Sequence, residues 1–337
     1  MYPPWAAGGE AGARQTDDLP IRWQTANMRA VFEPLRHIGS GLAYLATAQR
    51  QQRSDRKTAA QLAWPTKSPL PAGLELTWIG TAGYRLAYQG TVVWIDPYVT
   101  RLSKSAFALR RAVPSSEHQV HEWIDRADAV LVGHTHFDHA LDVPTIARRW
   151  GCPVYGSSSL RNLMGLHGLA DYAVVVEPKR TYEVGPFRFH FVPSVHSKLQ
   201  LGLGIPYSGE LTCDHVDELV PQAYKCGQVW GLAIEVAGLR IYHQGSADLL
   251  EDEVIDRGVD MFLCGISGRR FTPHYVERVV RALDPKLIVA SHYDDFFRPL
   301  DEPLELSFNV NLTGFADEAY AAARDVPVYT LEIGKQV

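Results

Sequence analysis

Most of the sequence alternates short apolar segments with turn residues and helix-like stretches. Residues 74–80, 84–90 and 91–97 have the composition of successive strands, and Gln89-Gly90 suits the tight turn of a hairpin. Further along, apolar strand-like segments such as 127–134 run into helix-like ones. Hairpins mixed with β–α units predict an α/β fold in which two mixed β-sheets pack together and are flanked by helices.

The first part of the chain, residues 1–70, is different in character. It mixes Gly, Ala, Pro and Gln and shows little strand periodicity. One helix is predicted within 28–50, although Pro34 and two glycines weaken it. We expect an extension over 1–70, partly ordered and packed on a main domain over 71–337. The alternative is a helix that lies on a membrane surface or binds a partner.

Composition limits the function classes. The chain has 337 residues and a formal net charge of −5, which gives no sign of a nucleic-acid partner. Its four cysteines are scattered without a CxxC pair, which favours a reducing compartment. No apolar run approaches the length of about 20 residues that spans a bilayer, and no signal peptide is evident. A cytoplasmic location is therefore expected.

The sequence LVGHTHFDHALDVP, residues 131–144, concentrates histidine and aspartate directly after the apolar run Ala-Val-Leu-Val. Residues two apart in an extended segment point the same way, so His134 and His136 can bind one ion together, while Asp138 and His139 face a neighbouring position. Burying these groups at a strand end is costly unless a cation holds them together. Imidazole and carboxylate ligands suit zinc, with iron and manganese as alternatives.

This motif, together with VWIDPY, FVPSVHSK and LIVASHYDDF elsewhere in the chain, resembles the signature of the metallo-β-lactamase superfamily. The resemblance covers roughly residues 74–334. It implies an αββα sandwich in which loops at one edge of the two sheets hold the metals. It also implies that Asp96 supports the metal-binding loop without itself binding, and that His196 and His292 complete the ligand set.

The resemblance implies one or two zinc ions per chain, with manganese or iron as alternatives, and a metal-bound hydroxide that attacks the substrate. Three ligands are expected for each metal: His134, His136 and His196 for the first, and Asp138, His139 and His292 for the second. Asp138 could also accept a proton from the attacking water. Tyr293 could donate to a developing oxyanion, or could simply pack beside His292.

The sequence departs from the superfamily pattern at one ligand. The superfamily places a metal-bridging Asp after a Gly at a strand end, and the corresponding stretch here is LRIYHQGSADLL. Ser246 occupies the position of that Asp, and Asp248 follows two residues later. Asp248 could still reach the metals, since residues two apart share a face. Otherwise Ser246 leaves the second site weak or empty, and either residue could cap a helix.

Two segments are candidates for substrate contact. The segment 99–112 carries four cations and no acid, and could meet an anionic substrate or simply be solvated: Arg101, Lys104, Arg110 and Arg111. The segment 197–228 is long, as lids near active sites often are. Its alternating apolar residues could line a lipophilic entrance or belong to a β-excursion: Leu199, Leu201, Leu203, Ile205 and Tyr207.

Within the superfamily, the early Ile-Asp-Pro-Tyr and the late Ser-His-Tyr-Asp are closest to the branch of N-acyl-phosphatidylethanolamine phospholipase D and the UlaG lactonase-like group. That branch implies a hydrolase of a phosphodiester, lactone or related ester or amide bond in a small-molecule or lipid-like substrate. The extension leaves peripheral membrane contact open. The alternative is a superfamily member with a degraded second site that acts as a binding or regulatory protein.

Overall fold

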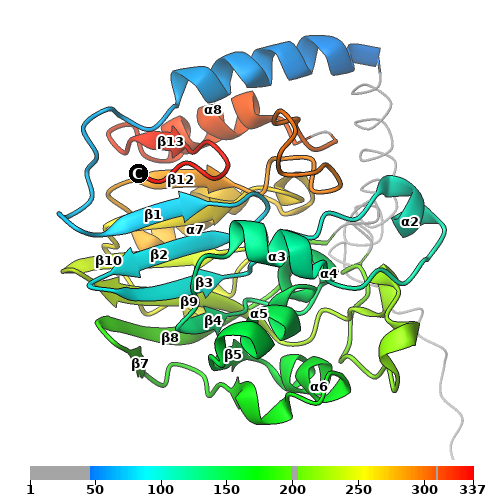
Figure 1. Cartoon of the computed structure of the whole chain (residues 1–337). Helices are drawn as coiled ribbons and strands as arrows, with labels where there is room; N and C mark the ends of the chain where they lie inside the picture. The colour runs from blue at the N-terminus through cyan, green and yellow to red at the C-terminus, as the bar shows by residue number, and fades with distance from the viewer. Residues whose placement is uncertain (1–45, 199–203, 309) are drawn as a thin grey trace, which may run out of the picture.

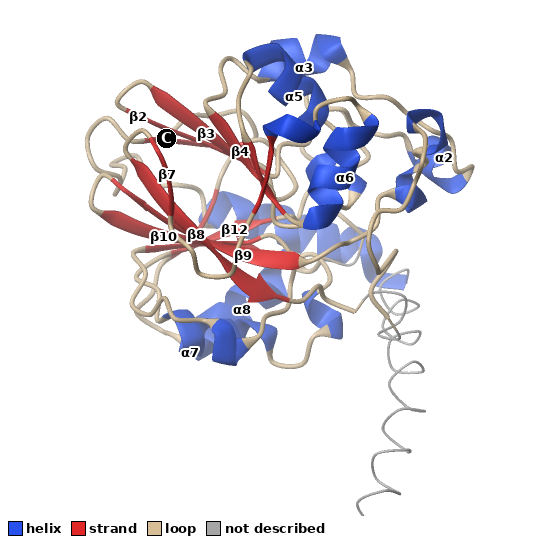
Figure 2. Ribbon diagram, turned by 90° about the horizontal axis from the view of Figure 1, so that it is seen from below, coloured by secondary structure: helices blue, strands red, loops and turns tan. Residues whose placement is uncertain are grey.

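The computed structural model describes residues 46–198, 204–308 and 310–337. Their strands form two mixed sheets that face each other, with helices on both outer sides (Figures 1 and 2). The predicted αββα sandwich is confirmed.

The first sheet has six strands in sequential order. Strands β1 to β3 form an antiparallel meander, and β3 to β6 are parallel. Gln89 and Gly90 join β2 to β3 with φ values of 49° and 78°, which confirms the predicted tight turn. The strand bounds are β1 (Glu75–Trp78), β2 (Tyr84–Tyr88), β3 (Thr91–Ile95), β4 (Ala129–Leu131), β5 (Val154–Gly156) and β6 (Ala173–Val175).

The second sheet has seven strands in the order β13-β12-β11-β10-β9-β8-β7. Strands β7 to β10 are antiparallel and β10 to β13 are parallel. Strands β8, β10 and β12 therefore run in the same direction. The strand bounds are β7 (Tyr182–Val184), β8 (Phe187–Ser194), β9 (Val229–Val236), β10 (Leu239–Gln244), β11 (Met261–Gly265), β12 (Ile288–Ser291) and β13 (Val328–Thr330).

Helices cover the outer faces of both sheets. In Figure 2, α3, α5 and α6 lie outside the first sheet, and α7 and α8 lie outside the second. The α-helix bounds are α2 (Lys104–Ala108), α3 (Glu117–Trp123), α4 (Phe137–Ala140), α5 (Val143–Trp150), α6 (Ser158–Leu166), α7 (Tyr275–Leu283) and α8 (Leu312–Ala322). The 3₁₀ turns of the described residues have the bounds η1 (Ala170–Tyr172), η3 (Val216–Glu218), η4 (Pro221–Ala223), η5 (Glu251–Glu253) and η6 (Arg269–Phe271).

Strand alternation divides the interior into two cores. On β3, Val93 and Ile95 face the core between the sheets, whereas Val92 and Trp94 face the core under α3, α5 and α6. All four side chains are buried, because the strand is covered on both faces. The polar residues that directly follow such a strand are therefore buried as well.

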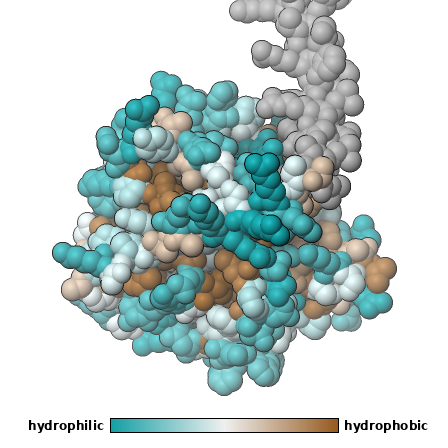
Figure 3. Space-filling model, turned by 90° about the horizontal axis from the view of Figure 1, so that it is seen from above, coloured by the Kyte–Doolittle hydropathy of each residue, from teal (hydrophilic) through white to brown (hydrophobic). Residues whose placement is uncertain are grey.

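Helix 46–61 continues past the predicted end at residue 50, while residues 28–45 of the predicted helix lie outside the described residues. The helix runs beside α8 (Figure 1). Asp55 is buried and accepts hydrogen bonds from the backbone N and Oγ1 of Thr313, both 2.8 Å long. The chain then pairs with β13, where Trp64 N donates to Thr330 O over 3.1 Å. Figure 3 looks onto this side, where hydrophilic side chains dominate and hydrophobic ones form scattered patches.

We found no helix in the described part of the chain that is both long enough and apolar enough to cross a membrane.

Candidate metal centre

The polar motifs follow strands from both sheets. Asp96 follows β3 and His134 lies after β4 in the first sheet, while His196 and His292 follow β8 and β12 in the second. Strands β3 and β4 are parallel to each other, and β8 and β12 share a direction, so each sheet brings its strand ends to one edge. The two edges meet, and segments far apart in the sequence supply a common cluster.

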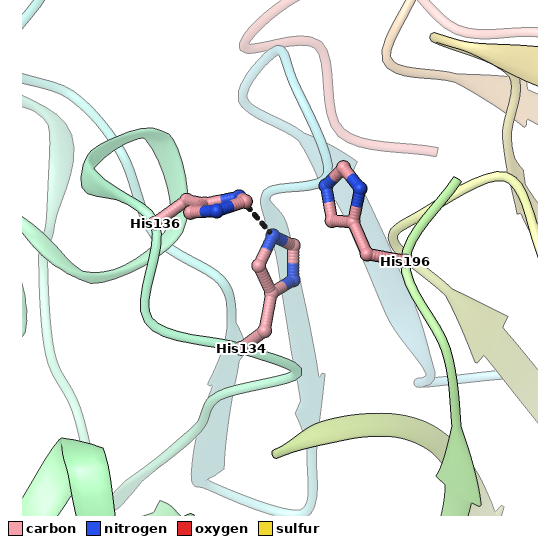
Figure 4. A group of neighbouring side chains, drawn as sticks. All are labelled: His134, His136 and His196. Atoms are coloured by element: carbon pink, nitrogen blue, oxygen red, sulfur yellow. Dashed lines mark hydrogen bonds between the residues drawn. The ribbon is translucent and has the colours of Figure 1, made fainter. Parts of the chain in front are cut away.

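The first ligand group consists of His134, His136 and His196, whose nearest ring nitrogens all lie within 4.8 Å of one another. Figure 4 shows the three imidazoles converging, with His134 Nε2 and His136 Nδ1 3.0 Å apart. In His136 and His196 the other ring nitrogen is held by a backbone oxygen. His136 Nε2 bonds to Pro206 O over 2.9 Å, and His196 Nδ1 bonds to Ser197 O over 2.8 Å. These bonds orient the remaining nitrogens toward one point.

The second ligand group consists of Asp138, His139 and His292, again with donor atoms within 4.8 Å. His292 Nε2 and His139 Nε2 lie 3.4 Å and 3.8 Å from Oδ2 of Asp138. The two groups adjoin, since the ring centroids of His134 and His139 are 3.9 Å apart. Six residues that the motif and the resemblance singled out are thus brought together.

Asp96 orients the second group. Its Oδ2 accepts a hydrogen bond from His139 Nδ1 over 2.9 Å, and its Oδ1 accepts one from the backbone N of Gly133 over 2.7 Å. This leaves Nε2 of His139 with its lone pair free for an ion. Glycine is required nearby, because a Cβ on Gly245 would lie 2.9 Å from Oδ2 of Asp96. The supporting role expected for Asp96 matches this geometry.

Burial determines the protonation of the first group. Desolvation lowers the pKa of His134 well below its usual value, that of His136 to about 4 and that of His196 to about 3. The three imidazoles are therefore neutral near pH 7, the form that binds metal. Burial also lowers the pKa of His139, but Asp96 and Asp138 outweigh that effect and raise it overall.

Two site residues have unusual backbone conformations. Asp96 and His292 have φ values of 42° and 57°, in the left-handed region. Thr81, at φ 51°, accepts a hydrogen bond from the backbone N of His292 over 2.8 Å. A β-branched residue in this region is strained, and such strain is concentrated at functional sites.

The two groups fit transition-metal ions. All six side chains are buried, and imidazole with a single carboxylate is a donor set typical of zinc, iron or manganese. Without a cation, five imidazoles and a carboxylate would be crowded together with few partners. Nδ1 of His292, for example, is buried with no hydrogen-bond partner among the described residues.

Asp248 is not part of this cluster. Its Oδ1 accepts from the backbone N of Leu249 over 2.9 Å and from Arg278 over 3.1 Å, so its carboxylate is engaged elsewhere. The expectation that Asp248 reaches the metals is therefore not met. Ser246 lines the cavity beside the cluster, and its hydroxyl donates to Val195 O over 3.2 Å. The position of the bridging Asp thus holds a neutral hydroxyl.

Tyr293 points away from the site. Its hydroxyl donates to Leu331 O over 3.1 Å, and its ring packs on Trp78 with centroids 4.8 Å apart. Only 1% of the residue is exposed. Residues 292 and 293 follow the strand β12, where successive side chains point to opposite sides. The expected oxyanion role of Tyr293 therefore gives way to packing.

The cations of 99–112 do not line the cavity. The side chain of Arg101 is 1% exposed and pairs with Asp294 over 3.0 Å, so it is a structural ion pair. Lys104 pairs with Asp295. Arg110 and Arg111 are exposed and lie outside the cavity lining. The expectation that these four residues contact substrate is thus not supported.

A cavity of about 330 Å³ opens beside both ligand groups. Tyr207 and Pro206 line it from the segment after His196, whereas Leu199, Leu201 and Leu203 lie outside the described residues and Ile205 is not among the lining. The lining also includes four phenylalanines that the sequence reasoning missed: Phe107, Phe137, Phe296 and Phe297. For three of them the signal was proximity to a ligand in the sequence, since Phe137 lies inside the histidine motif and Phe296-Phe297 follows His292 closely, whereas Phe107 lies in the basic segment 99–112.

Comparison with known proteins bears on this site. A family model described as the beta-lactamase superfamily domain matches residues 75–292. A UPF0173 metal-dependent hydrolase from Myxococcus xanthus is 29% identical over 269 residues, covering 77% of this chain and 84% of that protein. A second, from Cupriavidus necator, is 27% identical over 246 residues, covering 67% and 78%.

Among solved structures, CmlA, a diiron beta-hydroxylase from Streptomyces venezuelae, has a TM-score of 0.52 at 14% identity, covering 80% of this chain and 55% of that one. This likeness concerns the fold alone. The family match spans strands β1 to β12 and all six candidate ligands. The chain therefore belongs to the metallo-β-lactamase superfamily, in the family described as the beta-lactamase superfamily domain.

Proposed function

We propose that this protein is a hydrolase that depends on metal ions held by the two ligand groups. The observation that carries the proposal is the pair of adjoining three-residue groups, all buried, beside one cavity. Three protein ligands leave coordination positions open for water and substrate, which is typical of catalytic sites. The names of the curated relatives, metal-dependent hydrolases, support the same function.

In this proposal His134, His136 and His196 hold the first ion, and Asp138, His139 and His292 hold the second. Zinc suits this imidazole-rich set, with iron or manganese as alternatives. When bound, such an ion lowers the pKa of a bound water to about 7 and polarises the bond to be cleaved. The chain's own contribution is to orient the imidazoles through Asp96 and backbone oxygens.

Asp138 has a second role in the proposal. It is the only carboxylate among the described residues that line the cavity. Burial would raise its pKa, but His139 and His292 outweigh burial and hold the pKa below its usual range. The carboxylate is therefore ionised at neutral pH and can take the proton that the attacking water loses.

Among the candidate bonds, we place carboxylic esters, including lactones, before phosphodiesters. The described lining of the cavity carries no Lys or Arg, and Arg101 and Lys104 are paired with Asp294 and Asp295. The charge of a phosphodiester would then be balanced by the metal ions alone. A neutral ester needs no such balance.

One observation favours a second function. Ser246 stands where a bridging carboxylate is expected, and Asp248 is paired with Arg278. The six candidate ligands then contain one carboxylate, which neutralises little of the charge of two divalent ions. A chain that retained only the first ion could act as a binding or regulatory protein.

The test combines metal analysis with a hydrolysis screen. The chain is loaded with zinc, manganese or iron(II), and its metal content is measured. Turnover is then assayed on p-nitrophenyl acetate, a lactone, bis-p-nitrophenyl phosphate and a β-lactam. We expect metal uptake and turnover of the ester or lactone. His134→Ala should lower the metal content by loss of the first ion and abolish turnover, while His190→Ala, which removes a half-buried imidazole paired with Asp256, should preserve metal content and turnover.

One bound ion per chain, with turnover no higher than that of His134→Ala on every substrate, would support the binding protein instead. Turnover of the phosphodiester alone would reverse our order of bonds.

A further inference from the structure

The phenylalanines beside the metal ligands form one aromatic cluster from three segments. Phe107 belongs to α2, Phe137 begins α4, and Phe296 and Phe297 follow His292. The ring centroids of Phe107 and Phe297 are 5.2 Å apart, and those of Phe107 and Phe137 are 5.7 Å apart. Phe296 and Phe297 are separated by 4.6 Å. We call these four residues the aromatic wall.

The aromatic wall is joined directly to the ligand groups. Phe137 lies between His136 and Asp138 in the chain, and the Phe296 ring meets His292 edge to face, with centroids 5.6 Å apart. Phe107, Phe296 and Phe297 are only partly buried, so they present ring surface to the cavity. Apolar surface that a fold leaves partly exposed inside a cavity is available to a ligand.

The charged and polar side chains of the cavity also favour a largely apolar ligand. Apart from the Tyr207 phenol, the ionisable lining among the described residues is limited to candidate metal ligands: His136, Asp138, His196 and His292. The other polar side chains of the described lining are the neutral hydroxyls of Ser246 and Ser267. Beyond the metal ions, then, the described lining offers a ligand apolar and aromatic contact and neutral hydroxyls, but no charged partner.

We propose that the aromatic wall binds an aromatic ring of the substrate, so that the bond to be cleaved lies over the two ligand groups. This inference rests on the proposed function for the chemistry, and adds the substrate class: small, uncharged molecules with an aromatic ring next to the scissile ester or lactone. The cavity of about 330 Å³ is at the small end of ligand sites, roughly 300–1,000 Å³, and suits one ring rather than a long lipid chain.

The physical reason for aromatic selectivity is the arrangement of the rings. The ring planes of Phe107 and Phe297 are inclined to each other at 60°, and those of Phe296 and Phe297 at 35°. A ring of the substrate can therefore pack edge to face or offset-stacked against them. Aromatic pairs contribute beyond their buried area because ring edges and faces carry opposite partial charges. A saturated ring of similar size would bury as much apolar surface but would lack the attraction between ring edges and faces.

The experiment measures binding of three hydroxamates to the metal-loaded protein by calorimetry. Hydroxamates chelate zinc, and the three differ in the attached group: methyl in acetohydroxamate, cyclohexyl in cyclohexanecarbohydroxamate and phenyl in benzohydroxamate. We expect benzohydroxamate to bind most tightly and acetohydroxamate most weakly. Phe297→Ala and Phe107→Ala should each weaken benzohydroxamate by roughly 3- to 10-fold, with unchanged metal content and unchanged affinity for acetohydroxamate.

Leu109→Ala is the matched control, since Leu109 lies two residues beyond Phe107, is 61% exposed and is outside the cavity lining. It should leave all three affinities unchanged. Equal binding of the phenyl and cyclohexyl compounds, or an equal loss of all three in the Phe variants, would overturn the inference. A preserved preference for the phenyl compound in a protein without turnover would instead contradict the proposed function alone.

Discussion

His139 donates a hydrogen bond from Nδ1 to Oδ2 of Asp96 over 2.9 Å, and both side chains are almost fully buried. The bond links the end of β3 to the helix α4, which carries Asp138 and His139 of the second ligand group. The same carboxylate accepts from the backbone of Gly133, so one residue fixes both the ring and the loop before the histidine motif.

The first prediction concerns this carboxylate. Asp96→Asn keeps the size of the side chain but removes the charge that orients His139. Metal affinity at the second ligand group should fall by about 10- to 100-fold, with a smaller effect on the first. Competition with a chelator measures both. Asp128→Asn is the control, because Asp128 accepts from Val92 N at the opposite end of β3. Equal affinities for Asp96→Asn and the unaltered protein would contradict the role of Asp96.

The second prediction concerns the close approach at Gly245. An added Cβ would lie 2.9 Å from Oδ2 of Asp96 and 3.1 Å from Cε1 of His243. Gly245→Ala should therefore lower the free energy of unfolding by roughly 1–3 kcal/mol, and reduce metal content through Asp96. Urea unfolding measures the first effect.

Gly165→Ala is the matched control for this substitution. Gly165 lies in α6, and its added Cβ would meet nothing closer than 4.0 Å. The free energy of unfolding should rise by up to about 1 kcal/mol. Similar effects of the two substitutions would show that the approach of Gly245 to Asp96 is unimportant.

The third prediction separates the two aspartates that the sequence offered as ligands. Asp248→Asn should leave metal content unchanged, because its carboxylate binds Arg278. Its cost should be limited to about 1 kcal/mol of stability or less, as for partly exposed ion pairs. Asp138→Asn should empty or weaken the second group. Metal analysis of the two variants decides, and loss of metal from Asp248→Asn would restore Asp248 as a ligand.

The fourth prediction is the pH dependence of stability without metal. Burial lowers the pKa of His134 well below its usual value, that of His136 to about 4 and that of His196 to about 3. In the unfolded chain these groups titrate near about 6.5. Below that pH the unfolded chain holds more protons, so stability should be greatest above it and fall as the pH decreases toward 4.

His139 acts in the opposite direction, because its pKa is raised overall. The raised pKa of this one histidine offsets only part of the loss of stability at low pH that the other three histidines cause. Denaturant unfolding of the metal-free protein across this range measures the result, and a free energy of unfolding that stays constant would contradict it. Bound metal should shift the decline to lower pH, since protons and metal compete for the same nitrogens.

Much of the fold and of the ligand set was predictable because it depends on local pattern. Turn residues at Gln89-Gly90 and alternating apolar residues identify the strands and their order. The spacing of His134, His136, Asp138 and His139 determines which side chains can share an ion. The resemblance to a known superfamily added Asp96, His196 and His292, which no local pattern could have joined to the motif.

Only the tertiary structure decided which side chains pair with each other. Asp248 and Arg278 are 30 residues apart, and Arg101 and Asp294 are 193 apart, yet each pair forms an ion pair that removes a candidate from the site. Tyr293, which follows β12, contacts Leu331 and Trp78, two residues that lie far from it in the sequence or beyond the next strand. The sequence by itself determined the two-sheet fold and the ligands of the histidine motif, since these follow from periodicity and spacing, and its resemblance to the superfamily supplied the remaining ligands. The tertiary structure alone decided which charges are neutralised and which rings line the cavity, because a side chain's partners come from whichever segments the packing brings beside it.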